Sequence, residues 1–356
     1  MTAGAPPTLS PALAPAGPPA LAPPSARSAR GRGRDSISSW PLIDRVGYAL
    51  CWGAGLLLCA IAGAIVVFML VKGLAYLRPS LLLASPSSAR SQSATGGFLD
   101  PIEGTLLITA IGIALAAPIG VAVAVWLSEY RRPASLARAV ESGIEMIAGA
   151  PSVVLAFFGL LVFARPLLAF LSQTSAGGVV YGRSFFAAGA MMSLLALPLV
   201  IGATREGLAQ IPAQMREASY ALGKTRATTI RRVLLPAVRP SIASGATLGM
   251  GRIIGDTAIV VILLGDSLRL EGAGGAPLLS ALRGTGSTLT SYVYDNSPAG
   301  EGNAPQKAYA AAFVLLMMVL ALNMLVTRLS AGRTTGARGL GALVPAGLRG
   351  RLPWTR

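Results

Sequence analysis

The stretch REASYALGKTRATTIRRVLLP, residues 216–236, lies between two long apolar segments and carries five basic residues and one glutamate. Residues 217–222 are good helix formers, and Gly223 can adopt a left-handed conformation that turns the chain. Residues 225–234 predict a second, basic helix that ends at Pro236. The small side chains of Ala218 and Ser219 would let another backbone approach closely. The stretch therefore predicts two short helices joined at a glycine.

The middle of this stretch, Gly223-Lys224-Thr225, matches the end of a phosphate-binding loop. Such a loop has the pattern G-x-x-x-x-G-K-[ST] and follows a strand, so a second glycine would be needed at position 218. Position 218 is alanine, and the residues before it favour a helix, so nucleotide binding is excluded here. Two interpretations remain: a segment that docks in a groove of another protein, or a solvated basic loop that only fixes topology.

The composition indicates a membrane protein. The chain has 356 residues, is 53% hydrophobic and only 12% charged, and has a mean hydropathy of +0.63. Average soluble domains contain about 25% charged residues. The net charge of +16 lies mainly in loops and tails without interleaved aromatic residues, which favours orientation in a bilayer over nucleic-acid binding. The chain has no histidine, which weakens the hypothesis of a membrane enzyme.

Several apolar segments are long enough to cross about 30 Å of hydrocarbon. We expect membrane spans near Ala49–Val71, Leu106–Leu127, Ser152–Phe170, Phe185–Ala203, Ile242–Leu264 and Ala308–Leu329. The third follows a Gly-Ala-Pro sequence at residues 149–151 and contains Arg165, which favours a broken or partly re-entrant span. The predicted fold class is all-α: a polytopic membrane protein with about six transmembrane helices.

The regions outside the spans define the domain limits and the orientation. Residues 1–45 are rich in proline, alanine and arginine and predict a disordered tail, and residues 331–356 form a second basic tail. The membrane domain would cover residues 46–330, with the polar loop at 205–240. Alternate loops and tails hold 21 of the 30 basic residues. The positive-inside rule therefore places both termini and the opening stretch in the cytoplasm.

The opening stretch resembles the cytoplasmic motif of ABC importer permeases, E-A-A-x-x-x-G followed by nine residues and I-x-L-P. Two departures are mild, serine for the second alanine and valine for isoleucine. The matching positions are Glu217, Ala218, Ser219, Gly223, Val233, Leu235 and Pro236. This resemblance implies the permease fold of a type I importer and a coupling helix that docks into a separate ATPase subunit, where ATP would be hydrolysed.

Further stretches are similar to the permeases of the phosphate (Pst) importer, namely 103–130, 148–160 and GRIIGDTA at 251–258. Residues 288–316 resemble the PstA-like subunit more than the PstC-like one. The resemblance implies phosphate as substrate, a location in the plasma (inner) membrane among lipid, and three partners. These are a PstC-like permease, a PstB-like ATPase and a PstS-like phosphate-binding protein.

The resemblance leaves other functions open and implies no catalytic residue, metal or cofactor on this chain. Within the family, the alternatives are a PstC-like subunit or a permease for another oxyanion such as molybdate or sulfate. Outside the family, the alternative is an ATP-independent secondary transporter, which the docking motif argues against. No nucleic-acid partner is expected.

Charged side chains inside the fifth predicted span are the candidates for a transport pathway. Arg252 and Asp256 are four residues apart, so a continuous helix would stack them on the face that carries Gly245 and Gly249. Because charges inside a membrane are costly, they usually mark a pathway. An arginine fork suits phosphate, Asp256 would balance it, and Thr257 could add a hydroxyl. The alternative is a structural salt bridge.

Two further carboxylates, Glu141 and Glu145, lie four residues apart before the Gly-Ala-Pro sequence. They lie near the predicted cytoplasmic edge, and Arg138 is close enough along the chain to pair with Glu141. Without histidine or a nucleophile motif nearby, we interpret them as structural residues or as a subunit contact.

Overall fold

The computed structural model describes residues 41–86, 96–171, 181–265, 277–298 and 304–331, and the chain divides into two compact units at residues 64 and 65. The described part of the first unit, residues 41–64, lies in helix α1, and its side chains are exposed. Helix α1 begins at Leu42, inside the segment predicted as a tail. The rest of both predicted tails lies outside the described residues, apart from Pro41 before α1 and Ala331 at the end of the last helix.

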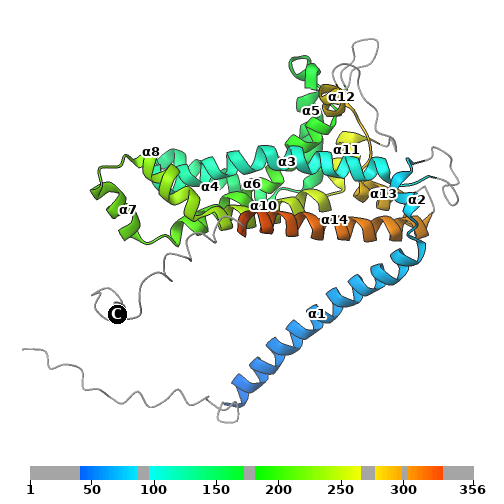
Figure 1. Cartoon of the computed structure of the whole chain (residues 1–356), viewed down its shortest axis with the longest axis horizontal. Helices are drawn as coiled ribbons and strands as arrows, with labels where there is room; N and C mark the ends of the chain where they lie inside the picture. Colours follow the sequence, from blue (N-terminus) through cyan, green and yellow to red (C-terminus); the bar gives the residue numbers. More distant parts are fainter. Residues whose placement is uncertain (1–40, 87–95, 172–180, 266–276, 299–303, 332–356) are drawn as a thin grey trace, which may run out of the picture. The chain divides into compact units, whose positions relative to one another are not determined.

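The described elements of the chain are helices (Figure 1). The longer ones are α1 (Leu42–Tyr76), α3 (Leu99–Val125), α4 (Ala134–Gly149), α5 (Ser152–Phe163), α6 (Phe185–Ala209), α10 (Arg239–Gly255) and α14 (Pro305–Ala331). The shorter ones are α2 (Pro79–Leu83), α7 (Ala213–Ala221), α8 (Arg226–Thr229), α9 (Leu235–Ala237), α11 (Ala258–Leu264), α12 (Pro277–Arg283) and α13 (Leu289–Asn296). A 3₁₀ turn covers Pro166–Leu171, and π-helical turns cover Trp126–Tyr130 (η2) and Ile230–Leu234 (η4).

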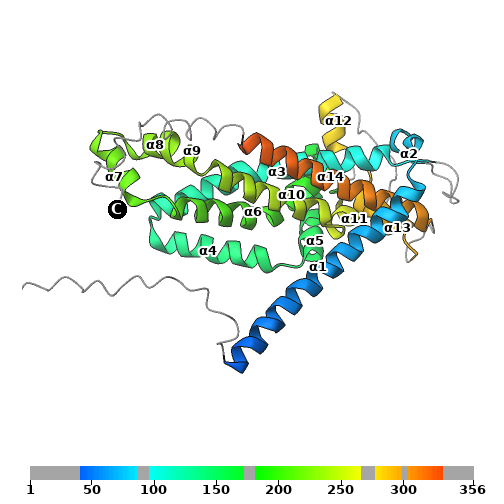
Figure 2. The same cartoon turned by 60° about the horizontal axis from the view of Figure 1, so that its bottom comes forward.

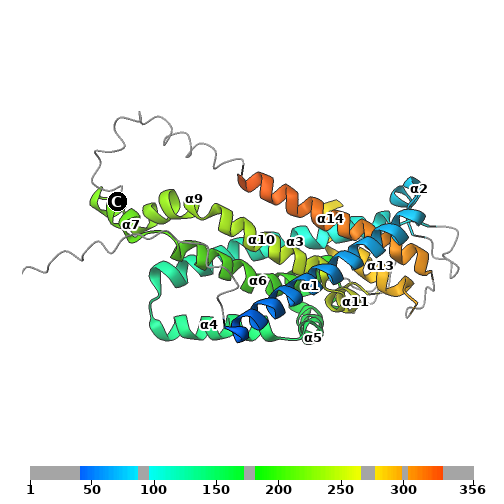
Figure 3. The ribbon, with the colours of Figure 1, turned by 90° about the horizontal axis from the view of Figure 1, so that it is seen from below.

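Helices α3, α6 and α10 pack side by side at the centre of the second unit (Figures 1 and 3). Small residues permit the close approach. A Cβ added at Gly245 would lie 3.0 Å from the Cα of Val200, and one added at Gly112 would lie 2.7 Å from the side chain of Ile253. Gly245 and Gly249 on α10 therefore lie at a close helix contact with α6.

The expectation of about six apolar spans agrees with the helices. Four of them are long and apolar enough to cross a membrane: Leu42–Tyr76, Leu99–Tyr130, Phe185–Ala209 and Pro305–Leu329. If each of two bent helix pairs counts as one span, the described residues hold as many as six spans. The pair α4 and α5 bends by 109° (Figure 2). Pro151 disfavours a helical conformation at the residue before it, and Ala150 has the extended ψ of 134°.

The expectation of one continuous helix over Ile242–Leu264 is wrong. Helix α10 ends at Gly255, Asp256 is extended with ψ of 123°, and α11 begins at Ala258 after a bend of 63°. The Oδ1 atom of Asp256 accepts a hydrogen bond from the backbone N–H of Ile259 at 3.0 Å. An aspartate side chain that binds a nearby backbone N–H offers the chain an alternative to the helix, and it starts a new helix here.

The orientation can be tested with single cysteines. In a background where Cys51 and Cys59, both exposed on α1, are replaced by serine, Ser297→Cys after α13 should react with an impermeant maleimide added to intact cells. Ala221→Cys on α7 should react only after permeabilisation. The reverse pattern would invert the orientation that the basic loops predict. Ser88 and Ser25, outside the described residues, extend the test to the first outer loop and the N-terminal tail.

Candidate functional site

The sequence-predicted helix–glycine–helix is present at residues 213–237. Helix α7 ends at Ala221, and Gly223 follows with the left-handed φ of +73°. The N–H of Gly223 donates to the carbonyl of Tyr220 at 2.9 Å, and the N–H of Lys224 donates to the carbonyl of Ser219 at 3.2 Å. These two bonds form a Schellman motif, which requires a left-handed residue at the Gly223 position. Glycine therefore sets the turn.

Hydroxyl groups join the two helices across this turn. The hydroxyls of Ser219 on α7 and Thr229 on α8 lie 2.8 Å apart, and both residues are buried. The side chain of Thr225 accepts from the N–H of Thr228 at 3.3 Å and caps α8. The second part of the segment contributes to a buried apolar cluster made of Leu208, Ile211, Ile230, Leu234 and Val238, and Leu235 of α9 packs against that cluster. We call residues 213–237, held together in this way, the coupling segment.

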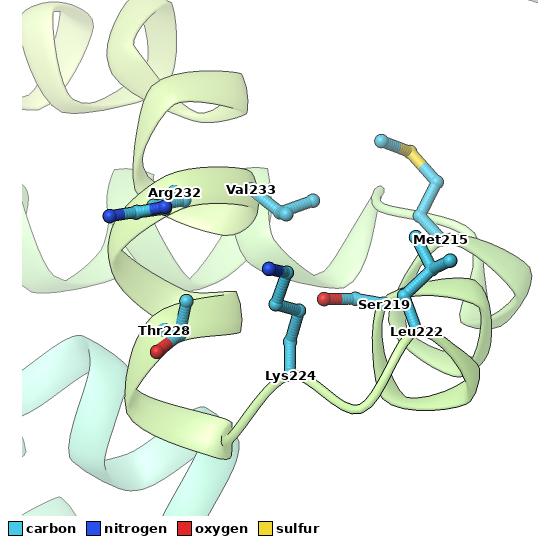
Figure 4. A pocket seen from close by; sticks show the side chains of 7 residues that line it. All are labelled: Met215, Ser219, Leu222, Lys224, Thr228, Arg232 and Val233. Atoms are coloured by element: carbon cyan, nitrogen blue, oxygen red, sulfur yellow. The ribbon is translucent and has the colours of Figure 1, made fainter.

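The coupling segment presents a hollow to solvent between its two helices (Figure 4). Its volume is about 230 Å³, and it is lined by Met215, Ser219, Leu222, Lys224, Thr228, Arg232 and Val233. Leu222, which lines it just after α7, is 77% exposed. Lys224, in the linker that follows Gly223, and Arg232, in η4, add positively charged side chains to the lining (Figure 4). Met215, 44% exposed, lines the hollow together with Leu222, and adjoining exposed apolar side chains beside charged ones are typical of a surface that a partner covers.

The structure divides the motif residues into exposed and packed positions. Glu217, Ala218 and Gly223 are exposed, whereas Ser219 is buried against Thr229. The expectation that Ser219 leaves room for another backbone is therefore wrong, because its side chain is used within the segment. The remaining motif positions, Val233, Leu235 and Pro236, are half-buried in the second part of the segment.

Two expectations about the second part of the coupling segment need correction. The helix predicted over residues 225–234 is α8 followed by the π-helical turn η4. Pro236 does not end it: the helical run continues through α9, and the break comes at Val238 instead.

The pathway candidates lie around the break between α10 and α11. Arg252 is exposed in the last turn of α10, Asp256 is 8% exposed, and Thr257 is half-buried. No ion pair joins Arg252 to Asp256 among the described residues, so the alternative of a structural salt bridge between these two side chains has no contact to support it. The two residues do not share a helical face, because the helix ends between them.

Three other ion pairs, which sequence spacing does not indicate, involve the predicted cytoplasmic side. Glu141 on α4 pairs with Arg205 at 2.9 Å and with Arg131 at 3.4 Å, rather than with Arg138 as expected. Arg216 on α7 pairs with Glu129 of η2 at 3.2 Å. Glu129 and Arg216 are 87 residues apart in the chain, so no local signal could have found them.

The chain combines apolar spans with a solvent-exposed helix–glycine–helix and with a charged break in one span. These features together are those of a membrane transport subunit. Residues 116–332 match the family described as the binding-protein-dependent transport system inner membrane component. The chain belongs to that family and is a permease of an ABC importer.

Relatives with similar sequences are permeases. The probable ABC transporter permease YqgH of Bacillus subtilis is 32% identical over 63% of this chain and 73% of its own length. The phosphate transport system permease PstA 1 of Mycobacterium tuberculosis is 32% identical over 64% and 69%. The phosphate transport system permease PstC of Mesorhizobium japonicum is 26% identical over 70% and 79%.

Solved structures agree on the fold. A chain of a bacterial ABC transporter for the acidic polysaccharide alginate has a TM-score of 0.54 at 18% identity and covers 82% of this chain and 99% of its own length. A chain of the MetNI methionine ABC transporter has a TM-score of 0.51 at 20% identity, over 66% of this chain and 95% of that one. At these identities the likeness shows the type I importer permease fold alone.

Proposed function

We propose that this chain is the PstA-like permease subunit of an ATP-driven importer of inorganic phosphate. The observation that carries the proposal is that an exposed coupling segment and a charged helix break occur in one importer permease. The first offers a surface for an ATPase, and the second offers a positive side chain to an anion.

The coupling segment supports docking to an ATPase subunit. Glu217, Ala218 and Gly223 face solvent, and the hollow beside them combines an exposed leucine with basic side chains. Because Ser219 is buried and Leu235 and Pro236 are half-buried, they would hold the shape of the segment, whereas Val233 also lines the hollow. An ATPase subunit of the PstB type would cover the exposed face, and hydrolysis would occur there.

Phosphate is supported by the relatives and by the chemistry of Arg252. Phosphate permeases of the PstA and PstC types both occur among the relatives, and the likeness of residues 288–316 favours PstA. A guanidinium fork matches a tetrahedral oxyanion, and Arg252 is exposed with no ion pair among the described residues. Asp256 and Thr257 would line the same break, where the carboxylate keeps the anion from binding too tightly.

The remaining subunits follow from the same proposal. A PstC-like permease would complete the pathway, and a PstS-like protein would deliver phosphate from outside. The importer would lie in the plasma (inner) membrane, with both termini and the coupling segment in the cytoplasm.

The proposed substrate is tested by transport. Vesicles that contain this chain and its copurifying subunits should take up radioactive phosphate only when ATP and the binding protein are supplied. Excess arsenate, which has the same shape and charge, should compete, whereas molybdate and sulfate should not. Competition by molybdate or sulfate at equal excess, with no phosphate uptake, would assign the permease to another oxyanion. Uptake without ATP would indicate a secondary transporter.

A further inference from the structure

The π-helical turn η2, at the end of the α3 span, contacts both helices of the coupling segment. Glu129 pairs with Arg216 on α7, and the guanidinium of Arg226 on α8 lies 5.5 Å from the ring centre of Tyr130. A π-helical turn is rare and occurs often at functional positions in helices. Here it places two consecutive side chains against the two sides of the Gly223 turn.

Arg216 is the most highly connected side chain of the coupling segment. Its Nε–H donates to Oε1 of Glu129 at 3.2 Å, and its two terminal nitrogens donate to the carbonyls of Ile211 and Leu208 at 2.8 Å each. The Leu208 carbonyl lies in the last turn of α6, where a cation is favourable, and the Ile211 carbonyl lies just beyond the end of that helix. The Glu129 side chain is only 8% exposed. One planar fork therefore ties α7 to the ends of both α3 and α6.

The two helices held by Arg216 lead directly to the pathway candidates. Helix α3 contacts α10 at Gly112, where an added Cβ would lie 2.7 Å from Ile253, the neighbour of Arg252. Helix α6 contacts α10 at Gly249, where an added Cβ would lie 3.1 Å from Ala196. Contacts this close leave little room for independent sliding, because packed interiors transmit displacement rather than absorb it. A movement of α7 would therefore reach the turn that carries Arg252.

We propose that Glu129 and Arg216 are positioning residues that transmit movement of the docked coupling segment to α3 and α6, and through them to the pathway. The proposal rests on the proposed function, because it needs an ATPase that moves α7. Neither residue belongs to the exposed face around Glu217 and Leu222, so docking and transmission are separable. Breaking the pair should let the ATPase bind and hydrolyse ATP while transport falls.

The experiment compares ATP hydrolysed per phosphate taken up in the reconstituted complex. Glu129→Gln and Arg216→Gln should each raise this ratio at least about five-fold, the lower end of typical coupling energies, with the ATPase content of the complex unchanged. The double variant should be no worse than Arg216→Gln, because the link that Glu129→Gln breaks is already lost when Arg216 is replaced. Arg216→Lys keeps the charge but loses the planar fork, so its ratio should lie between those of the wild type and Arg216→Gln. Glu141→Gln is the matched control: it breaks two arginine pairs that do not involve the coupling segment, and it should leave the ratio unchanged.

A ratio that stays at the wild-type value while uptake and hydrolysis fall together would overturn the proposal. So would an equal rise in Glu141→Gln, since the effect would then be general. If the glutamine variants do not reach the membrane, the ratio is measured in Arg216→Lys instead. If Arg216→Lys is also absent from the membrane, the pair is needed for folding and the proposal is overturned.

A second measurement does not depend on the substrate. No atom lies within 4 Å of a Cβ added at Gly251, so Gly251→Cys beside Arg252 should be tolerated. In the background without Cys51 and Cys59, ATP with vanadate should change the maleimide labelling rate of Gly251→Cys when Glu129 is present, but not when Glu129→Gln is added. An identical change in both would overturn the proposal. A wild-type complex that shows the change but carries no phosphate would refute the proposed substrate and leave the link intact.

Discussion

Replacing Gly223 with valine is expected to lower both ATPase copurification and phosphate uptake at least about ten-fold, while the chain stays in the membrane. The residue has a φ of +73° and closes the Schellman turn between α7 and α8. A β-branched side chain in this region costs about 1–3 kcal/mol. The turn would relax to relieve the strain, and the exposed faces of α7 and α8 would no longer present one surface. Binding-protein-stimulated ATP hydrolysis should fall with uptake.

Gly223→Asn is the matched control. No atom lies within 4 Å of a Cβ added at Gly223, so steric overlap at that atom is the same for both variants. Asparagine tolerates the left-handed conformation, whereas valine does not. The asparagine variant should therefore keep most of the wild-type ATPase association and uptake. Normal uptake in the valine variant would refute docking through this turn, and equal loss in both variants would show that the turn conformation is not the cause.

Arg252→Gln is expected to lower phosphate uptake at least about 30-fold at an unchanged membrane level, because truncating one partner of a desolvated charge pair costs about 2–5 kcal/mol. The partner lost here is the phosphate. Arg252 is exposed and has no ion pair within the described residues, so its removal should not unfold the chain. Membrane level is measured by quantitative blot and uptake by radioactive phosphate.

Asp256→Asn should behave differently from Arg252→Gln. The asparagine side chain keeps an oxygen that can accept from the N–H of Ile259, so the start of α11 and the membrane level should be preserved. Uptake should fall less than in the arginine variant, since the anion keeps its guanidinium and loses only the balancing charge. An Asp256→Asn variant absent from the membrane would mean that the negative charge itself holds the break.

Local signals predicted the coupling segment because its structure is local. Helix formers followed by a glycine indicate a left-handed end, and Gly223 adopts it. The Gly-Ala-Pro sequence likewise predicts a break before the third apolar segment, because a proline acts on the residue directly before it. In both places the responsible residues are neighbours in the chain.

Neither the break after Gly255 nor the contact between Arg216 and Glu129 was predicted from the sequence, and the physical reasons differ. Spacing of four residues predicts a shared face only where the helix continues, and Asp256 instead binds the N–H three residues ahead. A weak signal existed, since Gly251 and Gly255 lower the helix propensity before an aspartate that can cap the next helix. The pairing of Glu129 with Arg216 depends on the packing of α3 against α6, so no spacing rule applies to it.

The most direct test of a phosphate pathway past Arg252 is uptake by the double variant Arg252→Gln, Asp256→Asn, normalised to its level in the membrane. If phosphate passes Arg252, the double variant should be a stable, inserted protein whose phosphate uptake is as low as that of Arg252→Gln alone, because the anion still lacks its guanidinium. Uptake restored to near the wild-type rate by the second substitution would refute this pathway and assign both residues to the scaffold.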